Sequence, residues 1–419
     1  MMPLAQIMKA NGCQVEGSDR GLDQGRTAAK FEWLKAQGIK LYRQDGSGVV
    51  SRDQIVVAST AVEETVPDIV AANAVGAKRM RRADLLADLF NAAPVSIGVA
   101  GTSGKSTVTG MIGWILHACG RSLTVMNGAV MKNFVRADAP FASALVGSGD
   151  IFVSEVDESD GSIALYAPTI AVLNNIALDH KSMDELRALF SAFVGKARVA
   201  VLNADHTEVM ALGAAHTRTY SIGGSADIVA CDVCERPDGV DFHVNGLAAR
   251  LHVPGKHNVS NALAALAACE AAGVPLAEGI AALAGFTGLR RRLEVIGTAK
   301  GITVIDDFGH NPDKIAASLA TLHAFPGRLL ILFQPHGYGP LKQMGHELIA
   351  TFARDLAADD LLLLPDPVYQ GGTVDKSVGS AEIVAGIIAA GRYAEHIPQR
   401  ADCGARLLAE VRPGDRIVI

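Results

Sequence analysis

The chain has 419 residues, of which 49% are hydrophobic and 5% aromatic, and its 38 Lys and Arg against 44 Asp and Glu give a net charge of −6. This length predicts about two to three domains, and the aliphatic composition is typical of α/β proteins. The mildly acidic balance disfavours nucleic acid as the main partner, and no apolar run reaches the ~18 residues of a membrane span.

The cysteines and the start of the chain bear on its compartment. The six cysteines are scattered, as in a reduced cytosolic protein. Cys231 and Cys234 have the spacing of a metal or redox pair, but no second pair follows, so we favour two packed thiols. The first residues lack the charge and the apolar block of a signal peptide. We therefore expect a cytoplasmic enzyme.

Residues 1–93 alternate short strands with helices, a pattern that predicts a parallel sheet. A helix begins almost at the first residue, so we expect the first strand and Gly-rich loop of a doubly wound domain to be missing here. The expected strands are Cys13–Glu16, Ile39–Leu41 and Gln54–Ala58, and the expected helices are Pro3–Ala10, Thr27–Gln37, Asp68–Val75 and Arg82–Asn91.

The rest of the chain has two further patterns of predicted secondary structure. Residues 94–288 should contain buried strands, a β-rich patch at 218–254 and an Ala-rich helix at Ser260–Ala272. Residues 289–419 return to βα units, and the chain ends inside the last predicted strand. We expect an α/β fold of three domains, 1–93, 94–288 and 289–419, the outer two Rossmann-like and the middle one a P-loop parallel sheet. The expected strands of the last two are Ile151–Val156, Ile170–Asn174, Val199–Leu202, Ile302–Ile305, Leu329–Phe333, Asp360–Leu364 and Arg416–Ile419.

The most informative segment is Val95–Thr107, where an apolar run leads into a Gly-rich turn and then a helical pattern. Glycines let backbone N–H groups face phosphates without a Cβ in the way, and a helix N-terminus adds partial positive charge. Lys105 can reach the β- and γ-phosphates, and the Ser106 hydroxyl can hold Mg²⁺. The strict motif has glycine where this chain has Val99. We predict a variant nucleotide-binding loop rather than a turn that only caps a helix.

Further motifs lie at strand and helix ends. Four carboxylates within Glu155–Asp160 follow a strand and suit Mg²⁺, although a solvated acidic loop has the same pattern. The segment Asn174–His180 ends an apolar strand, and its histidine could ligate a metal or orient a phosphate. The segment Gly255–Asn261 opens the long helix with amide side chains that could read an adenine edge or only cap the helix.

In this order the motifs resemble those of the Mur ligase family, the ATP-dependent ligases that add amino acids to UDP-N-acetylmuramate. The resemblance covers nearly the whole chain. Gly288–Arg292, Ile305–Pro312 and Phe333–His336 also match family segments, and Val15–Asp19 and Ser59–Val62 match its UDP-binding segments.

The resemblance implies roles for individual residues. The catalytic residues would be Lys105, Glu155, His180, Arg291 and His310. ATP would contact Gly101, Thr102, Ser103, Gly104, Lys105, Ser106, Thr107, His257, Asn258, Asn261, Arg291, Asp306 and Asp307. Mg²⁺ would be held by Ser106, Glu155 and His180, and the UDP-sugar by Ser18, Asp19, Ser59 and Thr60.

The implied activity is that of an ADP-forming carboxylate–amine ligase in peptidoglycan synthesis. The carboxylate of UDP-N-acetylmuramate would attack the γ-phosphate of ATP, and an amino acid, foremost L-alanine, would attack the resulting acyl phosphate. We expect ATP and Mg²⁺ as cofactors, only small-molecule substrates, and a monomer or homodimer. A muramyl-peptide recycling ligase, another ATP-dependent amino-acid ligase and a degenerate ATP-binding regulator are the alternatives. They stay open because Gly337–Lys342 lacks the arginines that the family carries there.

Overall fold

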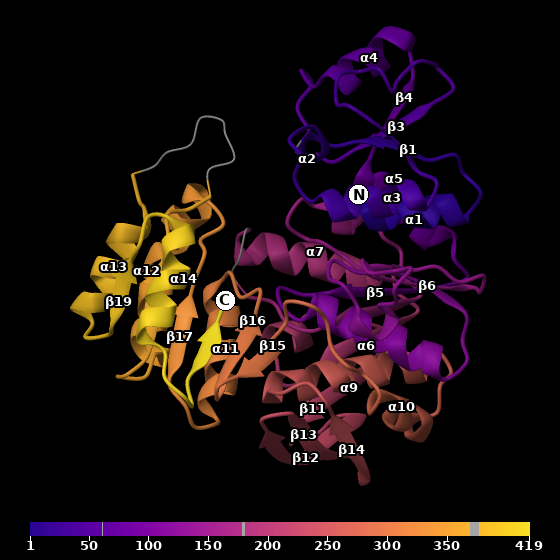
Figure 1. Cartoon of the computed structure of the whole chain (residues 1–419). Coiled ribbons are helices and arrows are strands. Elements are labelled where there is room, and N and C mark those ends of the chain that lie inside the picture. The colour runs from indigo at the N-terminus through magenta and orange to yellow at the C-terminus, as the bar shows by residue number, and fades with distance from the viewer. Residues whose placement is uncertain (61, 178–180, 369–376) are drawn as a thin grey trace. The chain divides into compact units, whose positions relative to one another are not determined.

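The computed structural model describes residues 1–60, 62–177, 181–368 and 377–419 (Figure 1). The chain divides into two compact units. Unit 1 comprises residues 1–229 and 261–283, and unit 2 comprises residues 230–260 and 284–419. Both units combine helices with mainly parallel sheets, so the predicted α/β class is confirmed. Within the described ranges, no helix has both the length and the apolar character needed to cross a lipid bilayer.

The first 93 residues form two small parallel sheets, one of β1 and β2 and the other of β3 and β4. Strand β1 lies about three residues beyond its predicted start, because the turn that ends α1 still includes Cys13, whose N–H bonds to Met8 O at 3.1 Å. The strands are β1 (Glu16–Ser18), β2 (Lys40–Tyr42), β3 (Ile55–Ala58) and β4 (Lys78–Arg81). The helices are α1 (Met2–Ala10), α2 (Arg20–Asp23), α3 (Ala28–Ala36), α4 (Pro67–Val75) and α5 (Arg82–Ala92).

A larger sheet forms the centre of unit 1, with strand order β11-β10-β9-β5-β8-β6-β7. Its strands are parallel except for β7. They are β5 (Val95–Ala100), β6 (Leu123–Met126), β7 (Ala144–Leu145), β8 (Ile151–Glu155), β9 (Ile170–Leu173), β10 (Val199–Asn203) and β11 (Thr217–Ile222). Buried strands of a parallel sheet read as nearly continuous apolar runs, which is why the sequence reveals them.

Helices cover this sheet. Helices α1, α5 and α7 contribute to one core with the strands, in which Phe90, Phe190 and Phe193 are at most 1% exposed. Helix α6 contacts β5, β6 and β8 and packs against α10, where Trp114 Nε1 donates to Ala282 O at 2.8 Å. The helical segments are α6 (Lys105–Ala118), η1 (Lys132–Phe134), η2 (Ser162–Leu165), α7 (Met183–Gly195), α8 (Thr207–Met210) and α10 (Leu276–Leu283). Helix α9 (Lys256–Ala271) crosses the boundary between the units, as does β12 (Ile228–Arg236).

Unit 2 contains the later part of the predicted β patch, after β11 of unit 1, and a second, mainly parallel sheet. Strand β13 (Gly239–Val244) pairs antiparallel with β12 and β14 (Leu247–Leu251). The second sheet has the order β15-β16-β20-β17-β18-β19, and β15 is antiparallel to β16. Its strands are β15 (Glu294–Ala299), β16 (Ile302–Asp306), β17 (Leu329–Leu332), β18 (Leu361–Leu364), β19 (Ala394–His396) and β20 (Arg416–Val418).

Alternate residues of β17 separate the two faces of this second sheet. Leu329 and Ile331 lie in a core with α11, α12 and α13, whereas Leu330 and Leu332 lie in a core with α14. The helices are α11 (Pro312–His323), α12 (Tyr338–Asp355), α13 (Ser380–Ala389) and α14 (Arg400–Glu410).

The interpretation of Cys231 and Cys234 as packed thiols is wrong. Both side chains are exposed. A bulge between them lets Cys231 pair with His243 and Cys234 with Asp241, so both cysteines lie on the solvent side of β12. Alternating polarity cannot reveal this, because a bulge shifts the two-residue period of a strand.

The central sheet of unit 1 should not tolerate a side chain at position 98. A Cβ at Gly98 would lie 2.9 Å from Phe193 Cζ and 3.3 Å from Phe90 Cζ, and both rings are buried in the core. We expect Gly98→Ala to lower the free energy of unfolding by about 1–3 kcal/mol in urea titrations. Gly195→Ala is the matched control, because nothing lies within 4 Å of its Cβ. An equal effect of the two substitutions would contradict this packing.

Candidate functional site

The phosphate loop connects β5 to α6 and contains two glycines with positive φ. Gly101 has φ 126° and Gly104 has φ 86°, conformations that other residues rarely adopt. A Cβ at Gly104 would lie 2.5 Å from Asn261 Oδ1 and 2.9 Å from Asn174 Nδ2. Position 104 therefore requires glycine both for its backbone and for the two amide side chains beside it.

Asn175, at the end of β9, holds the loop backbone. Its Oδ1 accepts a hydrogen bond from Ser103 N at 2.8 Å, its Nδ2 donates to Ser103 O at 3.2 Å, and its own carbonyl accepts from Thr102 N at 3.2 Å. The buried Thr102 hydroxyl donates to Ala177 O at 3.1 Å and accepts from Ala177 N at 2.9 Å. The N–H groups of Thr102 and Ser103 are thus directed at Asn175, just beyond β9, and the sequence did not indicate this use of the asparagine.

The first turn of α6 presents backbone N–H groups at the end of the loop. Lys105, Ser106 and Thr107 open the helix, so their N–H groups have no partner within it. Aligned peptide dipoles add partial positive charge at this end. These two properties suit an anion such as a phosphate group.

Two carboxylates of the acidic loop approach the start of α6. The Ser106 hydroxyl donates to Glu155 Oε2 at 2.7 Å. Lys105 Nζ donates to Gly101 O at 2.7 Å and lies 2.9 and 3.1 Å from the two carboxylate oxygens of Glu158. The structure brings together the predicted residues Lys105, Ser106 and Glu155, and it adds Glu158.

The other two carboxylates of this loop serve the backbone. Asp157 accepts from Ser159 N and Asp160 accepts from Ser162 N, each at 2.9 Å. Burial raises the pKa of Asp157, but the hydrogen bonds from Ser159 and the charge of Lys105 outweigh it and keep this pKa below its ordinary value. Of the four carboxylates, Glu155 and Glu158 are therefore the two that contact the start of α6.

The donors at this position suit a hard cation. Mg²⁺ takes one or two carboxylates and otherwise keeps water or phosphate oxygens, and Ser106 and Glu155 offer such oxygen atoms. A Cβ at position 128 would overlap the Glu155 carboxylate, so Gly128 leaves room for it. No group of three or more His, Cys, Asp or Glu forms a metal cluster in the described part of the chain. The predicted ligand His180 lies outside the described residues.

The residues predicted to contact adenine lie on the first turns of α9. This helix begins at Lys256, four residues before its predicted start, because Asn258 N bonds to Gly255 O at 2.9 Å and Asn258 Nδ2 donates to Pro254 O at 2.7 Å. Asn258 is buried, whereas His257 is exposed. Asn258 therefore stabilises the start of the helix, and Asn261 lies beside Gly104 of the phosphate loop.

In unit 2, the two aspartates after β16 have different environments. Asp307 accepts from Leu293 N at 3.0 Å and from the Ser318 hydroxyl at 2.6 Å, so it supports the backbone. Asp306 lies 3.7 Å from Arg291 Nε, and burial raises its pKa despite that guanidinium. Asp307 is thus held by a backbone N–H and a hydroxyl, whereas Asp306 faces the guanidinium of Arg291.

Two histidines and two arginines surround Phe308. The guanidinium groups of Arg291 and Arg292 lie 4.7 and 5.1 Å from its ring centroid. The rings of His310 and His336 stack with centroids 5.4 Å apart and planes 12° apart. Burial, followed by the charge of Arg291, lowers the pKa of His336. His336 was absent from the predicted site residues, although the Gln-Pro-His motif could have indicated it.

The predicted UDP-sugar residues have local partners. The Ser18 hydroxyl donates to Asp68, which also accepts from Gly46 N at 2.8 Å and so ties the first small sheet to α4. Asp19 caps α2 through Gly21 N at 2.7 Å. Ser59 O accepts from Val62 N at 3.1 Å, in the segment with Thr60 that follows β3.

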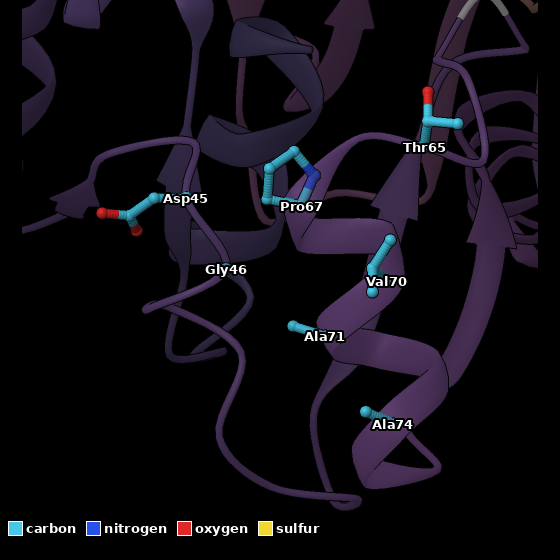
Figure 2. A pocket seen from close by; sticks show the side chains of 7 residues that line it. All are labelled: Asp45, Gly46, Thr65, Pro67, Val70, Ala71 and Ala74. Atoms are coloured by element: carbon cyan, nitrogen blue, oxygen red, sulfur yellow. The ribbon is translucent and has the colours of Figure 1, made fainter.

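A cleft beside α4 contains none of these four residues. Figure 2 shows the side chains that line it, with Val70, Ala71 and Ala74 along one side of the helix. Its volume is about 450 Å³, and its lining residues are Asp45, Gly46, Thr65, Pro67, Val70, Ala71 and Ala74. The lining is mostly small and apolar, and nothing in it resembles a phosphate site.

Comparison with known families accounts for these features together. The model described as "Mur ligase family, catalytic domain" matches residues 1–93, "Mur ligase middle domain" matches 99–269 and "Mur ligase, glutamate ligase domain" matches 291–419. The chain belongs to the Mur ligase family, whose members are ATP-dependent ligases.

Two individual proteins are similar to this chain over most of its length. A UDP-N-acetylmuramate–L-alanine ligase of Streptomyces coelicolor is 36% identical over 392 residues, covering 88% of this chain and 82% of that protein. The protein of the same name from Streptomyces avermitilis is 33% identical over 441 residues, covering 100% and 91%.

Two solved structures share the fold along the whole chain. The UDP-N-acetylmuramate-alanine ligase of Thermotoga maritima superposes with a TM-score of 0.81 at 24% identity, covering 100% of this chain and 92% of that one. A murein peptide ligase of Psychrobacter arcticus gives a TM-score of 0.72 at 24% identity, with the same coverage. At this level of identity the similarity shows the fold.

Removing the charge of Arg291 should raise the pKa of His336, because that guanidinium disfavours a second positive charge nearby. We expect the Cε1–H resonance of His336 to titrate at higher pH in Arg291→Gln than in the wild type. Arg290→Gln removes the same charge from an exposed neighbour and should leave this titration unchanged. An unshifted or lowered pKa in Arg291→Gln would contradict the arrangement.

Proposed function

We propose that this chain joins an amino acid, foremost L-alanine, to the carboxylate of UDP-N-acetylmuramate and converts ATP to ADP and phosphate. The observation that carries this proposal is the 2.7 Å contact between Ser106 and Glu155 at the start of α6, beside Lys105. Identity of 33–36% with relatives of that named activity over nearly the whole chain supports it. These substrates imply a cytoplasmic reaction in peptidoglycan synthesis.

Each segment has a proposed share of the binding. Residues 1–93 would bind the UDP-sugar through Ser18, Asp19, Ser59 and Thr60. Residues 94–288 would bind ATP, with the adenine near His257, Asn258 and Asn261 on α9. Residues 289–419 would bind the incoming amino acid. Small molecules are then the substrates, and the chain acts as a monomer or homodimer.

Charge neutralisation is the main requirement of the first chemical step, since a carboxylate must approach a phosphate of the same sign. Lys105 and the N-terminus of α6 supply positive charge to the β- and γ-phosphates. Ser106 and Glu155 would hold Mg²⁺, which neutralises phosphate charge when bound. Attack of the substrate carboxylate forms an acyl phosphate and ADP.

The second step needs a neutral amine, because an ammonium group has no free electron pair. Burial and the charge of Arg291 lower the pKa of His336 and so favour its neutral imidazole, whose unprotonated nitrogen would take the amine proton. Asp306, beside Arg291, and His310, stacked on His336, would orient the amino acid. Attack on the acyl carbon then releases phosphate from a tetrahedral intermediate.

Phosphate release tests this proposal directly. The assay contains ATP, Mg²⁺ and UDP-N-acetylmuramate, with a panel of single amino acids and short peptides. We expect release only when both the sugar nucleotide and one donor are present, with L-alanine the best donor. The panel matters because the stretch Gly337–Lys342 lacks the arginines that alanine-adding members of the family carry after Gln-Pro-His. Release with a tripeptide alone would instead indicate muramyl-peptide recycling, and no release despite ATP binding would indicate a regulator.

Lys105→Ala should lower turnover by at least about 100-fold, because one cationic donor to the phosphates is lost. The measurement is steady-state ADP formation at saturating substrates. Lys35→Ala removes an exposed lysine that pairs with Glu32 of its own helix, and it should retain full activity. Near-normal turnover by Lys105→Ala would refute the assignment of the phosphate loop.

Glu155→Gln should raise the Mg²⁺ concentration needed for half-maximal activity by about tenfold or more, because a neutral amide is a weaker ligand for a hard cation. Asp160→Asn is the control, since it lies in the same loop and caps Ser162 N. If both variants kept the Mg²⁺ dependence of the wild type, the acidic loop would have no role in metal binding.

A further inference from the structure

Glu158 is a buried carboxylate that the proposed chemistry does not use. Its side chain is 5% exposed, and its charge is paired with Lys105, whose side chain is 20% exposed. A carboxylate removed from water needs a counter-charge or several hydrogen bonds to remain ionised. Lys105 supplies that charge here, so the lysine of the phosphate loop already has an anionic partner.

The backbone around Glu158 is held by its own loop. Gly161 N donates to Glu158 O at 3.1 Å, and Asp157 and Asp160 accept from Ser159 N and Ser162 N. Ile163 N also donates to Asp157 O at 3.1 Å. These bonds tie the loop to η2, so the carboxylate of Glu158 is presented to Lys105 from a fixed backbone.

The ammonium group of Lys105 has three N–H donors. In this structure Gly101 O takes one, at 2.7 Å, and the two oxygens of Glu158 lie 2.9 and 3.1 Å from Nζ. A phosphate oxygen that binds Lys105 must therefore displace Glu158 or share the ammonium with it. Either outcome makes nucleotide binding weaker than it would be with a neutral partner.

We propose that Glu158 is a positioning residue that holds Lys105 and competes with the phosphates for its ammonium group, so that the product ADP leaves more readily. This inference rests on the proposed function. ADP lacks the γ-phosphate and offers Lys105 fewer oxygens than ATP. The ion pair between Lys105 and Glu158 therefore re-forms more easily in competition with ADP than with ATP. The competition thus acts mainly on product release.

The test is calorimetric binding of ADP and ATP, each with Mg²⁺, to the full chain. Glu158→Gln keeps the shape of the side chain and removes its charge, and we expect its Kd for ADP to fall about tenfold, with a smaller fall for ATP. Asp160→Asn is the matched control, because it removes one charge from the same loop without contact with Lys105. Its two Kd values should equal those of the wild type.

Steady-state kinetics give a second readout. Product inhibition by ADP should become stronger in Glu158→Gln, and KM for ATP should fall without a rise in kcat. A purely structural role would not tighten binding, because a damaged loop binds nucleotide less well. If Glu158→Gln does not fold, Glu158→Asp, which withdraws the carboxylate by one methylene, should shift the Kd for ADP in the same direction.

Two results would overturn the inference. An unchanged or higher Kd for ADP in the Glu158 variants, beside normal binding by the wild type, would refute it alone. Absence of nucleotide binding by the wild type would refute the proposed function, and the inference with it.

Discussion

The geometry of the phosphate loop depends on the amide side chain of Asn175. A carboxamide offers one acceptor and donors, as a peptide group does, and here it pairs with both the N–H and the C=O of Ser103. With the N–H groups of Thr102 and Ser103 directed at Asn175, the first turn of α6 keeps its own for an anion. Gly104 lets the neighbouring amides approach the loop.

The same logic applies to the acidic loop after β8. Four carboxylates close together would repel each other in a dry site. Two of them bond to backbone N–H groups, Glu158 pairs with Lys105, and Glu155 meets the Ser106 hydroxyl. Separate partners relieve the repulsion, and they leave Glu155 as the carboxylate beside the hydroxyl that a P-loop uses for Mg²⁺.

In unit 2, packing decides which of several similar residues can act. Asp306 and Asp307 are adjacent in sequence, but the bonds from Leu293 N and Ser318 fix only Asp307. His310 and His336 come from different βα units and meet because β16 and β17 both flank β20 in the sheet. Arg291, Arg292 and the two histidines therefore lie around the Phe308 ring, and Asp306 lies beside Arg291.

From the amino-acid order alone one can predict the α/β class, most buried strands and the phosphate loop, because apolar periodicity and glycine spacing are local properties. Strand β1 and helix α9 begin at other residues than the sequence predicts, because hydrogen bonds of the neighbouring turns set where each element starts. Three features could be found only from the tertiary structure. They are the ion pair of Lys105 with Glu158, the hydrogen bonds of the Asn175 side chain to Ser103, and the exposure of Cys231. Each depends on which residues, distant in sequence or displaced by a bulge, share one place in the fold, and no local pattern encodes that.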